Sequence, residues 1–298
     1  MITINNNMYV LDTDNTSYVF AVLGSGQLEH LYYGRKLHAN EAVMTEKHTF
    51  IPGNTNVYNK DYSSYSLEDV CLEMSSLGKG DIREPFIEVT YPNGSSTTDM
   101  VFDRAEIIKG KEEYDTLPGS YDDNGDVEQL VIYLKDRNYN LTLELHYYVY
   151  EECDIITRSA KLVNSGNESV RLERLMSMQL DLNESDYELS FFNGAWAREM
   201  NRSRIPLRAG KYVNESVTGT SSNRANPFYM IGRSSTTEDY GECYGFNLIY
   251  SGNHYEAAQV NSYGKLRLVS GINPATFSYI IEAGKCFEAP EAVLTYSY

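Results

Sequence analysis

An alternation of apolar and polar residues with a period of two is the feature that most limits what this chain can fold into. In residues 141–149 every second residue is apolar, and polar Thr142, Glu144 and His146 fill positions between them. This spacing is typical of a half-buried antiparallel strand, because successive side chains of a strand point to opposite faces. The same pattern returns at 172–182, 187–191 and 265–268. No segment keeps helical spacing for three turns, so the sequence predicts an all-β protein with few or no long helices.

Turn sequences rich in Gly, Asn and Ser separate the predicted strands, and they lie at 93–94, 124–125, 165–167 and 251–253. Many short strands joined in this way predict a large antiparallel sandwich. The 26 tyrosines agree with that prediction. Tyrosine favours pleated, half-buried surfaces and can keep its hydroxyl group in water at the rim of a sheet.

Two segments, 37–82 and 193–227, break the strand rhythm and are predicted to be loops. The second carries one tryptophan and several arginines: Trp196, Arg198, Arg202, Arg204, Arg208 and Arg224. A structureless loop of more than about 12–15 residues in a compact domain is usually functional or disordered. A segment that contains Trp, Arg and Asn does not have the composition typical of disordered segments. We therefore expect both segments to be ordered by contact with something else.

The charge balance excludes two classes of partner. The chain has 25 Lys and Arg against 42 Asp and Glu, a net charge of −17. Phosphate polyanions and anionic lipids repel such a chain, so we expect neither nucleic acid nor a membrane as partner. No apolar run of about 18 residues and no signal-peptide core are present, and we expect a cytoplasmic protein. The four widely spaced cysteines predict reduced thiols with no chemical role.

No motif for autonomous catalysis is present. The chain has no Gly-rich phosphate loop, no His-Glu-x-x-His pair and no Gly-x-Ser-x-Gly elbow. Its five histidines are well separated, so we expect no metal site and no cofactor. Acidic pairs at 122–123 and 151–152 are expected on solvated turns of a chain with 42 carboxylates. No catalytic residue is assigned.

The stretch NGAWAREMNRSR at 193–204 holds the only tryptophan of the chain. Trp196 close to Arg198 suits an aromatic platform for a sugar, whose CH face can lie on the indole ring while Arg and Asn bind its hydroxyl groups. The alternative is that Trp196 fills the core and the arginines pair with the surplus acids. These residues alone leave both interpretations open.

Five segments, taken together and in order, resemble the N-terminal domain of glycoside hydrolase family 36 α-galactosidases. They are GKGDIREP at 78–85, EECDIITRSAKL at 151–162, GAWAREMNRSR at 194–204, TGTSSNRANP at 218–227 and GECYGFNLIYSGNH at 241–254. The resemblance implies a galactose-mutarotase-like β-supersandwich. It also implies a cytoplasmic bacterial enzyme, often tetrameric and independent of metal, that removes terminal α-linked galactose from melibiose, raffinose and related oligosaccharides with retention of configuration.

Family members continue past a position like Tyr298 into a (β/α)8 barrel, a unit of roughly 250 residues, followed by a small β domain. The nucleophilic and acid/base aspartates lie on that barrel, about 5–5.5 Å apart as retention demands. No residue of this sequence can take either role. We therefore expect residues 1–298 to form one N-terminal β-supersandwich domain that does not hydrolyse α-galactosides by itself.

The resemblance also implies roles for particular residues. This domain would pack on the barrel and help to close the sugar pocket, partly across the subunit interface. Trp196 and Arg198 would line or border the galactose pocket, Asn223 and Arg224 would brace their loop, and segment 50–65 would reach a neighbouring subunit's entrance. The chain departs from the family pattern at Asn193, where His is expected.

Two other functions remain as alternatives. The chain could be a stand-alone carbohydrate-binding or assembly module with Trp196 as its platform, and the reading frame downstream of Tyr298 distinguishes this from the enzyme. Another sugar-active enzyme with a supersandwich domain, such as a phosphorylase, is the third interpretation. The order of the five motifs argues against it.

Overall fold

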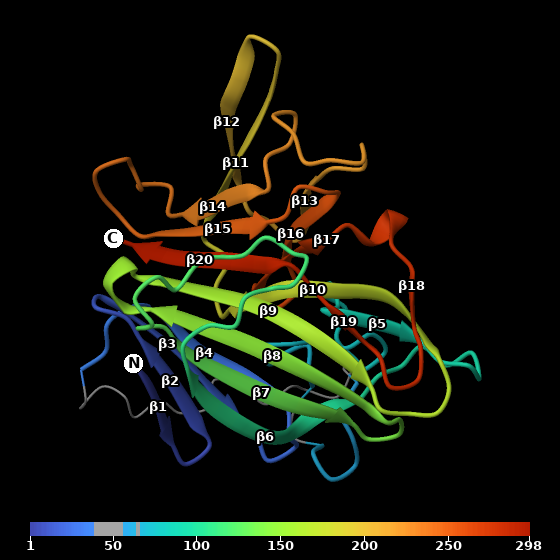
Figure 1. The fold of residues 1–298 in the computed structure, drawn as a ribbon. Helices are drawn as coiled ribbons and strands as arrows, with labels where there is room; N and C mark the ends of the chain where they lie inside the picture. Colours follow the sequence, from blue (N-terminus) through green and yellow to red (C-terminus); the bar gives the residue numbers. More distant parts are fainter. Residues whose placement is uncertain (39–55, 64–65) are drawn as a thin grey trace.

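The computed structural model describes residues 1–38, 56–63 and 66–298, and these residues form three β-sheets. All pairings between the named strands are antiparallel, and the only helical segments among the described residues are two 3₁₀ turns, η1 (Glu151–Cys153) and η2 (Pro274–Thr276). Figure 1 shows the sheets stacked with one hairpin projecting from the top. The predicted all-β, antiparallel fold is confirmed.

The largest sheet has ten strands. Their order is β12 (Arg198–Pro206), β11 (Glu188–Ala195), β14 (Phe228–Gly232), β15 (Cys243–Ile249), β20 (Glu291–Ser297), β9 (Ile155–Asn164), β8 (Leu141–Tyr150), β7 (Glu128–Asp136) and β6 (Met100–Lys109), with β19 (Cys286–Glu288) also paired to β9.

The other two sheets are smaller. The six-stranded sheet runs β13 (Gly210–Glu215), β16 (His254–Val260), β17 (Leu266–Ile272), β10 (Val170–Leu182) and β18 (Tyr279–Ile281), with β5 (Ile87–Thr90) also paired to β10. The four-stranded sheet runs β1 (Ile2–Asn5), β2 (Met8–Asp12), β3 (Thr16–Val22) and β4 (Leu28–Arg35).

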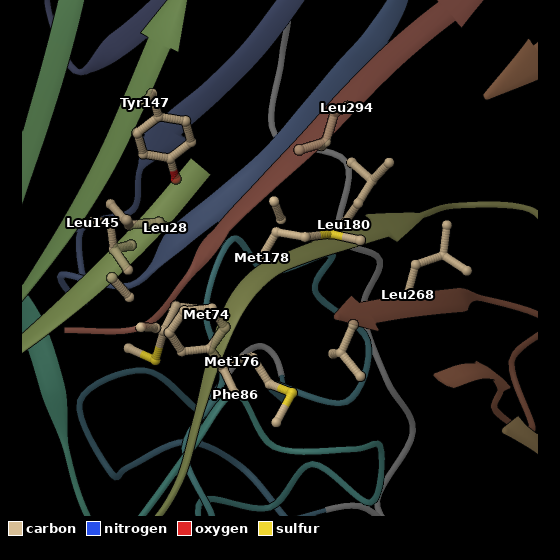
Figure 2. Packing of buried hydrophobic residues seen from close by; sticks show 14 of the residues in the cluster. Leu28, Met74, Phe86, Leu145, Tyr147, Met176, Met178, Leu180, Leu268 and Leu294 are labelled. Atoms are coloured by element: carbon tan, nitrogen blue, oxygen red, sulfur yellow. The ribbon is translucent and has the colours of Figure 1, made fainter. Parts of the chain in front are cut away.

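The sequence alternation of β8 places one face of this strand in the core. Along β8 the apolar residues from Leu141 to Val149 are buried, while Thr142, Glu144 and His146 are half-buried. Strand β8 lies between β7 and β9, with Leu145 opposite Ile132 and Ala160. All three sheets contribute to one contiguous apolar cluster. Figure 2 shows Tyr147 of β8, Leu294 of β20 and Met178 of β10 in this cluster.

The predicted turns occur, and several of them carry the chain from one sheet to another. Residues 165–167 connect β9 of the ten-stranded sheet to β10 of the six-stranded sheet, and 251–253 connect β15 to β16. Residues 93–94 lie between β5, which pairs with β10, and β6, which pairs with β7. These turns therefore join layers of the sandwich.

The prediction of a continuous loop over 193–227 is wrong. This segment contains the end of β11, all of β12 and all of β13. Strand β12 was missed because its residues do not alternate apolar with polar: most of its side chains are exposed on both faces. An edge strand with both faces exposed has no core face to impose such an alternation.

The other predicted loop, 37–82, contains no named strand in its described residues. Every residue from 66 to 75 is buried, so this part is ordered by contact with the domain itself. Much of the predicted segment 50–65 lies outside the described residues.

Two clusters of buried charges hold this segment to the sheets. Arg267 of β17 contacts the carboxylates of Asp81 at 2.8 Å and Asp181 at 2.6 Å, and Arg83 also pairs with both acids. The second cluster joins Arg158 of β9 to Glu73. The motifs at 78–85 and 151–162 therefore supply charged groups to the interior of the sandwich.

Candidate functional site

The β11–β12 hairpin is the element that carries Trp196. Its strands pair from Glu188 opposite Pro206 to Ala195 opposite Arg198, and Trp196 and Ala197 form the two-residue turn at the tip. Figure 1 shows that the hairpin extends away from the body of the sandwich. The tip of the hairpin is therefore accessible from outside the sandwich.

The local sequence explains the tight tip. A Cβ atom on Gly194 would lie 2.5 Å from the carbonyl oxygen of Arg198, so only glycine allows the two strands to approach this closely. Ala197 has a positive φ of 58°. Its N–H group donates to Oε1 of Glu199 at 2.8 Å, which helps to hold this left-handed conformation.

Trp196 is 91% exposed. This value excludes the alternative in which the indole ring fills the core. Arg198 is also exposed, and within the described part of the chain the guanidinium groups of Arg198 and Arg224 have no ion-pair partner. The turn thus holds an accessible aromatic face close to unpaired hydrogen-bond donors, as a sugar site requires.

One side of the hairpin base is fixed by Arg204. Its guanidinium group pairs with Glu188 and donates to the carbonyl oxygens of Arg233 at 2.7 Å and Ser234 at 3.1 Å. A cavity of about 340 Å³ lies beside this base and is lined by residues of β11, β12, β14, β15 and the C-terminal end of the described chain. Arg204 therefore pairs with an acid, as the alternative interpretation expected, and positions the hairpin.

The other side of the base is fixed by Asn226. Its backbone N–H and its side-chain Nδ2 both donate to the carbonyl oxygen of Phe192, at 3.0 and 3.2 Å, and Nδ2 lies 3.5 Å from Sδ of Met200. Asn226 thus contacts both strands of the hairpin.

The predicted bracing pair lies in the same loop. Asn223 and Arg224 are exposed, and the hydrogen bonds to the hairpin come from Asn226. Sequence reasoning missed this residue, although it lies in the quoted motif at 218–227 immediately before Pro227.

A buried pair of titratable groups lies beneath this loop. His254 and Glu256 are almost completely buried, and Nδ1 of His254 is 3.2 Å from Oε1 of Glu256. Burial raises the pKa of Glu256. Burial opposes a charge on His254, but the neighbouring carboxylate of Glu256 holds the pKa of His254 above its ordinary value.

The cysteines of the described residues form no disulfide. All four thiols are free, and burial raises the pKa of Cys71 to about 12, where the thiol is a poor nucleophile. Within residues 1–38, 56–63 and 66–298 no group of three or more His, Cys, Asp or Glu side chains is arranged to hold a metal ion. No helix in these ranges is long and apolar enough to cross a membrane.

Comparison with known proteins shows the family to which this chain belongs. A model of the glycosyl hydrolase family 36 N-terminal domain matches residues 26–282. The chain belongs to glycoside hydrolase family 36. Among characterised family members, it is 36% identical to α-galactosidase AgaA of Geobacillus stearothermophilus over 293 residues, which cover 96% of this chain and 39% of AgaA.

Solved family 36 structures agree with this assignment. The chain superimposes on α-galactosidase AgaB of Geobacillus stearothermophilus with a TM-score of 0.95 and 32% identity, covering 100% of this chain and 41% of AgaB. The superposition on the Lactobacillus brevis α-galactosidase has a TM-score of 0.93 at 36% identity, and it covers 99% of this chain and 40% of that enzyme. The chain corresponds to the N-terminal domain and spans about two fifths of the length of these family 36 relatives.

Proposed function

We propose that this chain is the N-terminal part of an α-galactosidase that hydrolyses terminal α-galactosyl residues of melibiose- and raffinose-type oligosaccharides with retention. Support comes from the family 36 relatives, which are α-galactosidases, and from AgaA structures with stachyose and raffinose bound. The nucleophile and the acid/base belong to the family's barrel, and this chain supplies neither.

In this proposal the β11–β12 hairpin is the sugar-facing element. The indole ring of Trp196 forms the platform for the apolar face of a sugar ring, and Arg198 donates hydrogen bonds to its hydroxyl groups. Asn223 and Arg224 border the same site from the neighbouring loop. The observation that carries the proposal is the 91% exposure of Trp196 at the tip of a hairpin fixed at its base.

The remaining parts of the proposal concern assembly. The domain packs on the catalytic barrel, helps to close the sugar pocket and supports a homo-oligomer, a tetramer in the parent enzyme, in the cytoplasm. The family resemblance supports each of these statements. Projection of the hairpin beyond the sandwich is consistent with contact to a barrel or to a second subunit (Figure 1).

The activity test compares two proteins: the 298-residue chain, and the product of the whole reading frame that encodes it. Both are purified and assayed with p-nitrophenyl α-galactoside and with raffinose. The proposal predicts turnover by the whole product and none by the 298-residue chain. Turnover by the shorter chain would overturn the assignment of catalysis to the barrel, and an inactive but folded whole product would overturn the activity.

A further inference from the structure

Four side chains form a continuous path from the interior of the domain to the base of the hairpin. Asn226 holds the carbonyl oxygen of Phe192, and the carbonyl oxygen of Asn226 accepts a 2.7 Å hydrogen bond from Nδ2 of Asn214. The same Nδ2 donates to Oε2 of Glu256 at 2.5 Å. Because an amide nitrogen carries two protons, Asn214 can serve both acceptors at once.

His254 completes the path and returns to the same loop. Its Nε2 atom lies 3.0 Å from the carbonyl oxygen of Ala225, the residue before Asn226. A carbonyl oxygen can only accept, so Nε2 must carry a proton. Nδ1 lies 3.2 Å from Oε1 of Glu256, and neither atom has a hydrogen-bond partner among the described residues. A second proton, on the imidazole or on the carboxyl group, would satisfy both atoms at once, whereas without it two unpartnered acceptors lie next to each other in a buried site.

We propose that His254, Glu256, Asn214 and Asn226 are positioning residues that fix the direction of the β11–β12 hairpin, and that they do so only while His254 and Glu256 share a proton. Loss of that proton leaves a buried carboxylate against an unprotonated Nδ1. The two side chains then separate, and Asn214 and Ala225 lose the partners that hold the loop at 225–226. The hairpin base loosens as a consequence.

Other ionisable groups set the pH at which this happens. Glu215 of β13 acts on His254 and accepts a hydrogen bond from Asn273 at 2.8 Å, while burial and the charge of Glu256 raise the pKa of Tyr229 on β14, which stays neutral. The negative charge of Glu215 favours a protonated His254. The shared proton is therefore retained above about pH 6.5, the ordinary value for histidine, and is lost only at higher pH.

The consequence for the sugar site rests on the proposed function. A hairpin fixed at its base holds Trp196 in one place before the sugar arrives, and such preorganisation lowers the cost of binding. The positioning path itself can be tested without any sugar. Failure of one idea therefore does not imply failure of the other.

The test uses the fluorescence anisotropy of Trp196, the only tryptophan in the 298-residue chain. Asn226→Ala is compared with Asn247→Ala, a half-buried asparagine on neighbouring β15 that makes no side-chain hydrogen bond within the described residues. We expect Asn226→Ala to lower the anisotropy by about one third or more, since the hairpin gains nanosecond motion, and Asn247→Ala to leave it unchanged. Near-UV circular dichroism checks that both variants are folded. Equal anisotropy in both folded variants would overturn the positioning role.

The role of the shared proton is tested by measuring the Trp196 anisotropy of the wild type and of Glu256→Gln from pH 6 to pH 9.5. The glutamine can donate to Nδ1 of neutral His254 and still accept from Asn214, so it replaces the shared proton with a fixed N–H group. We expect the wild-type anisotropy to fall with rising pH and that of Glu256→Gln to stay constant. A wild type that shows no fall, or a variant that falls in parallel with it, would overturn the role of the proton.

Discussion

The guanidinium group of Arg158 lies 3.1 Å from the carboxylate of Glu73, and both side chains are almost completely buried. Tyr18 and Tyr147 each donate their hydroxyl group to that carboxylate at 2.8 Å. Nδ1 of His30 lies 2.7 Å from it. A buried ion pair is tolerated only when its remaining polar atoms have partners. This pair joins β9 to the irregular segment at 66–75, which otherwise pairs with β4 through the single bridge between Glu29 and Leu72.

Removal of the Arg158 charge is expected to destabilise the fold strongly. Arg158→Met keeps most of the side-chain volume but leaves Glu73 buried without its cation. We expect the free energy of unfolding to fall by about 3–5 kcal/mol. Urea denaturation measures the loss. Arg171→Met on β10 is the control, because its contact with Glu173 is exposed and 3.9 Å long, and should change stability by less than about 1 kcal/mol. Similar losses in the two variants would contradict this account of the buried pair.

Acid is expected to weaken the domain through the same clusters. Burial alone would raise the pKa values of Glu73 and Asp81, but Arg158 with His30, and Arg267 with Arg83, hold them below their ordinary values. Their stabilising contribution is complete above the unfolded pKa values of about 4 and is lost as the pH falls through the lower folded values. Unfolding free energies measured between pH 3 and pH 6 should therefore decline toward pH 3. Asp81→Asn should show a shallower decline, and curves of equal slope would rule out the role of Asp81.

Gly194 is expected to be essential for the hairpin tip. In Gly194→Ala the new Cβ would meet the backbone of Arg198 and Glu199 at 2.5 and 2.8 Å, so the strands must separate there. We expect lower Trp196 anisotropy and a global stability within about 1 kcal/mol of wild type, since the tip is outside the core. Gly24→Ala is the matched control: its Cβ would make ordinary contact with Tyr62 at 3.5 Å. An unchanged Trp196 signal in Gly194→Ala would show that the tip is not as tight as described.

The segment between β6 and β7 is expected to depend on one lysine. Nζ of Lys111 lies 2.9 Å from Oε2 of Glu291 on β20, both side chains are buried, and Ser120 donates to the same carboxylate. Lys111→Met leaves Glu291 without its cation, which should cost about 3 kcal/mol. Limited proteolysis should then cut near exposed Tyr121 several-fold faster. Lys109→Met, an exposed change at the end of β6, should not alter the rate. Equal cleavage in the two variants would contradict the anchoring role.

Much of the fold could be predicted from the sequence. The alternation in β8, β10 and β17 arises because one face of each strand packs in the apolar core, which imposes apolar residues at every second position. In β10 and β17 the opposite face is buried as well, and its polar residues Asp181 and Arg267 pair with each other. The turns at 165–167 and 251–253 could be predicted from their Gly, Asn and Ser residues. The strands that each turn joins could not be predicted, because a Gly-Asn turn has the same composition whether it closes a hairpin or crosses to another sheet.

The site was predicted only in part. Residue type left Trp196 open between a sugar platform and the core, and the family resemblance assigned Trp196 and Arg198 to the sugar pocket; the structure places both in exposed positions. The alternation at 187–191 predicts the first part of β11, but β12 and the hairpin it forms with β11 were not predicted, because the exposed faces of β12 impose no alternation. Asn226 and His254 were missed because their roles depend on contacts between strands far apart in the sequence.

The most direct test of the proposed sugar site is the effect of Trp196→Ala on hydrolysis of raffinose by the product of the whole reading frame. Loss of the aromatic platform should reduce kcat/KM by about ten-fold, equivalent to about 1.4 kcal/mol of transition-state stabilisation, without change in the unfolding midpoint. Tyr263→Ala, an exposed aromatic residue in the turn between β16 and β17, serves as the control and should leave kcat/KM unchanged. A Trp196→Ala enzyme with wild-type kcat/KM for raffinose would contradict the assignment of the hairpin to the sugar site.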